Sequence, residues 1–142
     1  MSEKTKYNIF RKNVLNVKQC DRIDRIENVV LAGMPDVNYC FEGVEGWIEM
    51  KAPTEPKRAS TPLFGSNHKL SQEQKNWFKR QDNAQGRGYI LIATDKRWIL
   101  MMGSKADYIN EMPVNELVKE SRWSMLNNQK NWELLRWILA AL

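Results

Sequence analysis

Three residues of the types that hold metal ions and activate water lie close together in this sequence. Asp36 follows a proline, and Glu49 and Lys51 flank Met50 thirteen positions later. Because side chains alternate across a β-strand, Glu49 and Lys51 project from one face of any strand that contains them, and Met50 projects from the other. Two carboxylates and an amine on one face would form a site for chemistry on a phosphate ester.

Whether Asp36 shares this face depends on the hairpin turn that leads to Glu49. The numbers of facing residues in an antiparallel pair have a constant sum, and this sum must be odd for Asp36 and Glu49 to share a face. A two-residue turn at 42–43 gives a sum of 85 and sets Asp36 opposite Glu49, and a turn at 44–45 gives 89 and keeps the same face. An odd-length loop without a bulge would separate the two carboxylates.

Two carboxylates on one face repel each other unless a cation lies between them. Hard oxygen ligands suit Mg²⁺ or Mn²⁺, which keep water ligands and bind phosphate oxygens. Such an ion lowers the pKa of a bound water, and Lys51 could hold the attacking water or the phosphorane oxygens. The pattern therefore predicts phosphodiester hydrolysis. The structural alternative is that Asp36 caps a turn, while Glu49 and Lys51 lie on the solvated edge of a strand that ends at Pro53.

The residues around this pattern resemble those of the PD-(D/E)xK nuclease superfamily, and within it the small Holliday-junction resolvase and VRR-NUC proteins, including compact phage-encoded members. The resemblance covers about residues 20–103. It rests on Gly33-Met34-Pro35-Asp36, on Trp47-Ile48-Glu49-Met50-Lys51 and on the helix start from Leu70 to Trp77, with support from strands expected at 89–94 and 98–102.

The resemblance implies a role for each residue at a matching position. Asp36 and Glu49 would bind Mg²⁺ or Mn²⁺ together with the backbone carbonyl of Met50. Lys51 would be the catalytic lysine, and Gln74 would support the site from the following helix. The implied activity is a divalent-metal-dependent DNA endonuclease that cleaves branched DNA in the manner of a Holliday junction resolvase.

Many relatives present a further acidic residue from the first helix, and this is where the sequence departs from the pattern. The expected first helix at 7–20 contains no Asp or Glu. Glu27, just before the first expected strand, is the candidate for this position, and the alternative for Glu27 is a surface ion pair. The number of metal ions therefore stays open.

The element order expected from apolar spacing is α-β-β-β-α-β-β-α-α, an α/β or α+β domain with a mixed sheet flanked by helices. This order contains the αβββαβ core of restriction-endonuclease-like proteins. Ser71 and Gln74 form a capping-box pattern at the start of the second helix. The expected elements are a helix at 7–20, strands at 29–32, 35–41 and 46–51, an exposed loop at 52–70, a helix at 71–85, strands at 89–94 and 98–102, and helices from Ser104 on.

Length and composition fit one domain with a basic surface. The 142 residues are 42% hydrophobic and have a formal net charge of +5, which suits a polyanionic partner. We expect a single nuclease domain over 1–142, with its core at about 7–103 and a C-terminal helical extension at about 104–142. Candidate DNA-binding residues are concentrated around the long loop and the second helix: Lys57, Arg58, His68, Lys69, Lys75, Lys79 and Arg80. Of these, His68 has the weakest case.

The remaining expectations concern assembly and location. A terminal helix face formed by Trp132, Leu135, Ile138, Leu139 and Leu142 is either core or the interface of a homodimer, which would provide the two cuts of junction resolution. No leader or membrane-length apolar stretch is visible, so we expect a cytoplasmic protein, in the host cytoplasm if it is phage-encoded. Two other functions stay open: a general nicking nuclease on duplex or single-stranded DNA, and a non-catalytic nucleic-acid-binding module.

Overall fold

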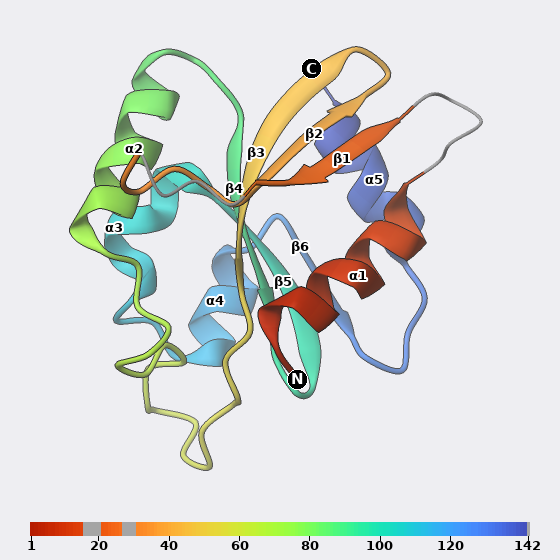
Figure 1. Cartoon of the computed structure of the whole chain (residues 1–142). Coiled ribbons are helices and arrows are strands. Elements are labelled where there is room, and N and C mark those ends of the chain that lie inside the picture. The colour runs from red at the N-terminus through yellow and green to blue at the C-terminus, as the bar shows by residue number, and fades with distance from the viewer. Residues whose placement is uncertain (16–20, 27–30, 142) are drawn as a thin grey trace.

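The computed structural model describes residues 1–15, 21–26 and 31–141 (Figure 1). None of the helices in these ranges is long and apolar enough to cross a membrane. The elements are α1 (Glu3–Val14), β1 (Arg22–Arg25), β2 (Val37–Phe41), β3 (Val44–Lys51), α2 (Gln72–Asn83), β4 (Gly88–Ala93), β5 (Arg97–Met102), the short 3-10 helix η2 (Gly103–Lys105), α3 (Ala106–Ile109), α4 (Val114–Glu120), β6 (Trp123–Leu126) and α5 (Trp132–Ala140).

The strands form one six-stranded sheet in the order β1-β2-β3-β4-β5-β6. β3 and β4 are parallel and are joined through α2, while every other neighbouring pair is antiparallel. Helices α1 and α5 lie on one side of the sheet, and α2, α3 and α4 lie on the other (Figure 1). The predicted fold class, a mixed sheet flanked by helices, is confirmed.

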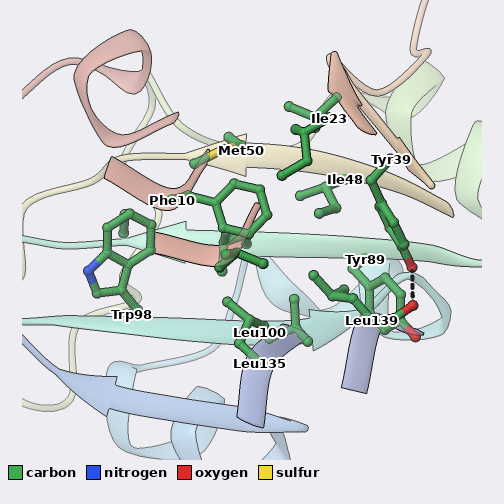
Figure 2. Packing of buried hydrophobic residues seen from close by; sticks show 14 of the residues in the cluster. Phe10, Ile23, Tyr39, Ile48, Met50, Tyr89, Trp98, Leu100, Leu135 and Leu139 are labelled. Atoms are coloured by element: carbon green, nitrogen blue, oxygen red, sulfur yellow. Dashed lines mark hydrogen bonds between the residues drawn. The ribbon is translucent and has the colours of Figure 1, made fainter. Parts of the chain in front are cut away.

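Each face of the sheet has its own hydrophobic cluster because successive side chains of a strand point to opposite faces. The α1/α5 cluster packs Phe10 of α1 and Leu135 of α5 against β-strand residues that include Ile48 and Met50 (Figure 2). The α2/α3 cluster packs Phe78 of α2 against Ile90 of β4 and its neighbours. Strand β3 therefore contributes Ile48 and Met50 to one core, while its alternate residues face the α2 side.

The β2–β3 hairpin has the register that the two-residue turn predicts. Val37 pairs with Ile48 and Phe41 pairs with Val44, so facing residues sum to 85. The turn residues are Glu42 (φ 52°) and Gly43 (φ 81°), both in the left-handed region that a two-residue hairpin of type I′ requires. The turn at 42–43 is thus confirmed, and the alternative turn at 44–45 is excluded.

The first strand was predicted at the wrong place. Val29 and Val30 lie outside the described residues, and Leu31 and Ala32 form a bend and a turn rather than a strand. Strand β1 lies instead in the charged segment that precedes them. It is a short edge strand, and edge strands tolerate charged residues that would be costly in the middle of a sheet.

Contacts of the charged side chains explain how this segment forms a strand. Ile23 is the one fully buried residue of β1. Arg22 forms ion pairs with Asp24 (2.6 Å) and with Glu45 of β3 (3.0 Å), and it donates a hydrogen bond to Asn38 Oδ1 (2.6 Å). Arg22 and Asp24 therefore form their ion pairs on the α2 side of the sheet, whereas Arg25 lies over the ring of Tyr7 on the α1 side.

Three further features differ from the predictions: a helix start, an additional strand and the burial of part of the long loop. Helix α1 begins at Glu3, four residues before the expected start at Tyr7, because Ser2 acts as its N-cap and accepts a hydrogen bond from Thr5 N–H. The region after Ser104 has the expected helices, but it also has strand β6, which adds to the edge of the sheet beside β5. The loop at 52–70 is not exposed throughout, since Leu63 and Phe64 are buried in the α2/α3 cluster.

Gly33 brings the segment before Asp36 against the first turn of α2. Its φ is +85°, and a Cβ at this position would collide with the backbone of Glu73 and Gln74. Only glycine combines this left-handed conformation with so close an approach.

We expect Gly33→Ala to lower the free energy of unfolding by about 2 kcal/mol or more, because the new methyl group meets backbone that cannot rotate away. Gly65→Ala is the matched control, since a Cβ at Gly65 meets nothing within 4 Å and its φ lies outside the left-handed region. Urea unfolding of both variants measures the difference. Equal stabilities would contradict the close packing described for Gly33.

Candidate active site

The hairpin register brings the two predicted carboxylates to one face of the sheet. Asp36 lies one residue beyond the Val37–Ile48 pair and so faces Glu49. Its Oδ1 accepts a hydrogen bond from the backbone N–H of Met50 (3.1 Å), and Lys51 Nζ lies 3.6 Å from Glu49 Oε2. The three residues that the sequence singled out therefore lie together at the C-terminal end of β3.

This group of charges is buried. Glu49 is 6% exposed and Lys51 is 8% exposed. The pKa of Glu49 is raised to about 8, chiefly by burial and next by the negative charge of Asp36, and Lys51 offsets only part of this effect. Burial also raises the pKa of Asp36, and the hydrogen bond from the Met50 N–H lowers it in part. The ammonium of Lys51 thus does not compensate for two carboxylates in this position.

The surroundings of β3 explain this burial. Glu49 lies beside Ile90 and Lys51 lies beside Ile92 in the parallel strand β4, and both isoleucines are completely buried. The charged face of β3 therefore borders directly on the α2/α3 cluster. An apolar border removes water from one side of the carboxylates, which disfavours their charged forms.

The chain that follows Lys51 is held by a second polar network. Arg97 contacts the Glu55 carboxylate through Nε (2.8 Å) and Nη2 (3.0 Å), a two-point ion pair. Thr94 donates its hydroxyl proton to the same carboxylate (2.6 Å), and Asp95 accepts a hydrogen bond from the backbone N–H of Glu55 (2.8 Å). The start of the long loop is therefore fixed to the β4–β5 hairpin.

Glu3 is an acidic residue near the site that the sequence analysis missed. Its negative charge raises the pKa of both Asp36 and Glu49, so it lies close enough to act on both. The predicted helix started at Tyr7 and therefore did not include Glu3. The N-cap residue Ser2, followed by the acidic Glu3, is the local signal for the earlier start. Glu27, the candidate for a further acidic residue, lies outside the described residues.

The donor atoms fit a hard divalent cation. Within the part of the chain that the structure describes, no group of three or more His, Cys, Asp and Glu residues is arranged to hold a metal ion. Mg²⁺, however, commonly uses one or two carboxylates together with waters and phosphate oxygens. The negative charge of Asp36 raises the pKa of Glu49, and an ion between the two carboxylates would offset this repulsion. Asp36, Glu49 and the Met50 carbonyl are the groups that would hold it.

Gln74 and Ser71 form the capping box that the sequence predicts. Gln74 Oε1 accepts a hydrogen bond from Ser71 N–H (2.9 Å), and Ser71 Oγ accepts one from Gln74 N–H (3.1 Å). The amide oxygen of Gln74 thus caps the helix. Support of the active site by Gln74 stays a prediction.

The predicted DNA-binding residues lie on the surface. Lys57, Arg58, Lys69, Lys79 and Arg80 are exposed, and Lys75 and His68 are half-buried. His68 Nδ1 has no hydrogen-bond partner among the described residues. These positions permit contact with a polyanion.

The sequence matches no known protein family and no curated protein. Among solved structures, the chain is similar to Hjc, a Holliday junction resolvase of the archaeal hyperthermophile Archaeoglobus fulgidus. The identity is 13% and the TM-score is 0.47, and the match covers 72% of this chain and 78% of that one. Because this similarity is remote, the function of the present chain rests on its own residues.

The raised pKa of Glu49 predicts how stability depends on pH. The folded state keeps a proton between its pKa of about 8 and the ordinary value of 4.5, whereas the unfolded state loses it. Without divalent cations, the free energy of unfolding should therefore fall by more than about 1 kcal/mol between about pH 5 and pH 8. Glu49→Gln should flatten this fall, and added Mg²⁺ should reverse it in the native protein.

Chemical unfolding at several pH values, with and without Mg²⁺, measures these effects. Glu45→Gln is the control, since Glu45 lies on the same strand but forms an exposed ion pair with Arg22. The same pH profile in Glu49→Gln and the native protein would refute the assignment.

Proposed function

We propose that this chain is a divalent-metal-dependent DNA endonuclease that cleaves branched DNA. The observation behind the proposal is the register of the β2–β3 hairpin, which places Asp36 opposite Glu49 with Lys51 Nζ 3.6 Å from the glutamate. Buried charges of the same sign destabilise a fold. A site that keeps them is therefore a candidate for binding an ion or for catalysis. The resemblance of the motif residues to PD-(D/E)xK nucleases points to the same chemistry.

The proposed reaction adds water across a phosphodiester bond and leaves a phosphate and a hydroxyl end. Asp36 is oriented by the Met50 N–H and would bind the ion together with Glu49 and the Met50 carbonyl. Mg²⁺, when bound, would lower the pKa of a water ligand and neutralise charge on the phosphate. The ammonium of Lys51 would donate hydrogen bonds to the attacking water and to the phosphate oxygens that gain negative charge.

Asp36→Asn and Lys51→Ala should each abolish Mg²⁺-dependent cleavage while DNA affinity changes little. Asn keeps the size of the aspartate but lacks its charge, and Ala removes the ammonium from the reacting phosphate. Gel assays on four-way junction, linear duplex and single-stranded DNA measure cleavage, and thermal unfolding verifies the fold. Full activity in either variant would refute these roles.

The same substrates separate the proposed function from its alternatives. Cleavage of junctions alone supports a structure-selective nuclease. Cleavage of all three substrates supports a general nicking nuclease, and binding without cleavage supports a non-catalytic module. Mn²⁺ in place of Mg²⁺ should also support cleavage, since both ions accept oxygen ligands.

Basic residues around the long loop are proposed to contact DNA phosphates. Lys57→Ala/Lys69→Ala should weaken binding to all DNA and reduce the slope of log affinity against log salt by about 2, roughly one for each lost contact. The control is Lys12→Ala/Lys130→Ala, which removes two exposed lysines from outside the loop and α2. Equal losses in both double variants would show only the effect of net charge.

Assembly and location stay proposals. The helix face considered for a homodimer is largely core, because Leu135 and Leu139 are completely buried in the α1/α5 cluster, and Leu142 lies outside the described residues. Leu134 (39%) and Trp137 (70%) are the exposed apolar residues of α5, so a two-fold dimer would use them instead. We also propose that the whole of 1–142 forms one nuclease domain that acts in the cytoplasm.

A further inference from the structure

A tryptophan on the central strand β3 belongs to neither hydrophobic cluster of the described residues. Trp47 is half-buried, although β3 lies in the interior of the sheet. It projects from the same face as Glu49, two residues away, so the two Cα atoms lie about 7 Å apart. Its strand neighbours are Asn38 on β2 and Gly88 on β4, and the side chains of Phe78 and Gln81 from α2 lie over the glycine.

Trp47 contacts a second half-buried tryptophan from helix α2. The rings of Trp47 and Trp77 lie 5.8 Å apart at 65°, an edge-to-face arrangement. Residues three positions apart lie on the same side of a helix, so Trp77 shares its side of α2 with Gln74 and Arg80. Arg80 is exposed. The Trp47–Trp77 pair therefore links the strand of Glu49 to a helix that has an exposed cation one turn beyond Trp77.

We propose that Trp47, held by Trp77, is a stacking platform for an unpaired nucleobase beside the phosphate that is cleaved. This inference rests on the proposed function and specifies its substrate: DNA with at least one unpaired nucleotide at the cut site. Bases in an intact duplex stack on each other and present no face to a protein ring. Aromatic side chains bind single-stranded bases by such stacking, and nearby arginines contact the backbone.

The surrounding contacts favour stacking over recognition of particular bases. Asn38, the polar neighbour of Trp47, already accepts from Arg22 (2.6 Å) and donates to the Gly46 carbonyl (3.1 Å). One amide hydrogen and one lone pair of the amide oxygen are therefore already used, and Asn38 is only 9% exposed, so little of its amide can reach a base edge. Stacking accepts every base because each has a π-face. The platform would therefore select unpaired DNA by its shape, and its binding would not depend on the base sequence.

A purely structural role for Trp47 is a weaker explanation. Helix α2 is already anchored by Phe78, which is 1% exposed, and by the close approach of its first turn to Gly33. Trp77 also contacts Phe78, with ring centroids 5.4 Å apart. The contact from Trp47 adds little to this anchoring, whereas it holds the indole at a fixed position near Glu49.

Fluorescence of 2-aminopurine tests the platform directly. The probe replaces one unpaired nucleotide at the branch point of a DNA junction, and binding is measured without divalent cations so that no cleavage occurs. Binding of the native protein should quench the probe, and Trp47→Tyr should keep the quenching because it keeps a ring. Trp47→Leu should abolish it and weaken binding to this junction about tenfold or more, with affinity for intact duplex unchanged.

Trp137→Leu is the matched control, since Trp137 is 70% exposed on α5 and lies outside the site. It should change neither quenching nor affinity. Equal losses for duplex and junction in Trp47→Leu, or unchanged quenching, would overturn the proposal. If Trp47→Leu does not fold, the probe is moved along the junction in the native protein: quenching only beside the cut supports the platform, and uniform or absent quenching refutes it.

The platform and the catalytic proposal fail in different ways. Quenching that depends on Trp47, in a protein that cleaves no DNA, would retain the platform and reject the nuclease. Cleavage with full activity in Trp47→Leu on every substrate would retain the nuclease and reject the platform. A native enzyme with the platform should also cleave junctions with unpaired nucleotides faster than fully paired junctions, and Trp47→Leu should remove that preference.

Discussion

The register of the β2–β3 hairpin is the constraint on which the site depends. Side chains alternate along a strand, so a slip of one residue would send Asp36 and Glu49 to opposite faces of the sheet. Two left-handed residues at the turn, Glu42 and Gly43, fix the sum of facing residues at 85. The approach of Asp36 to Glu49, and with it the contribution of Asp36 to the raised pKa of Glu49, requires this pairing.

The sequence shows which hairpin turns would bring the two carboxylates together, because parity follows from the residue numbers, and the structure selects the turn at 42–43. An even-length turn places both carboxylates on one face, and the capping box at Ser71 and Gln74 is equally local. The misplaced features depend on tertiary contacts. Strand β1 is highly charged and gains its stability from pairing with β2, and β6 is a short strand with alternating burial added at the sheet edge beside β5.

Glu3 illustrates a different limit of sequence reasoning. Hydrophobic spacing marks the buried face of α1 and says little about its first turn, which contributes few apolar side chains. The helix start therefore required the N-cap residue Ser2, a local signal that spacing does not contain. Burial of Glu49 was also beyond the sequence, because it depends on Ile90 and Ile92 lying beside β3 in the parallel strand β4.

Met50 couples the core to the site. Its side chain is 1% exposed within the α1/α5 cluster, while its backbone N–H donates to Asp36 on the opposite face. Packed cores resist small displacements, so the carboxylate is positioned by the same contacts that stabilise the sheet. A strand with one face in the core can therefore hold like charges and a half-buried indole on the other face. The free energy of that packing offsets the electrostatic cost of a site that neither Lys51 nor water neutralises.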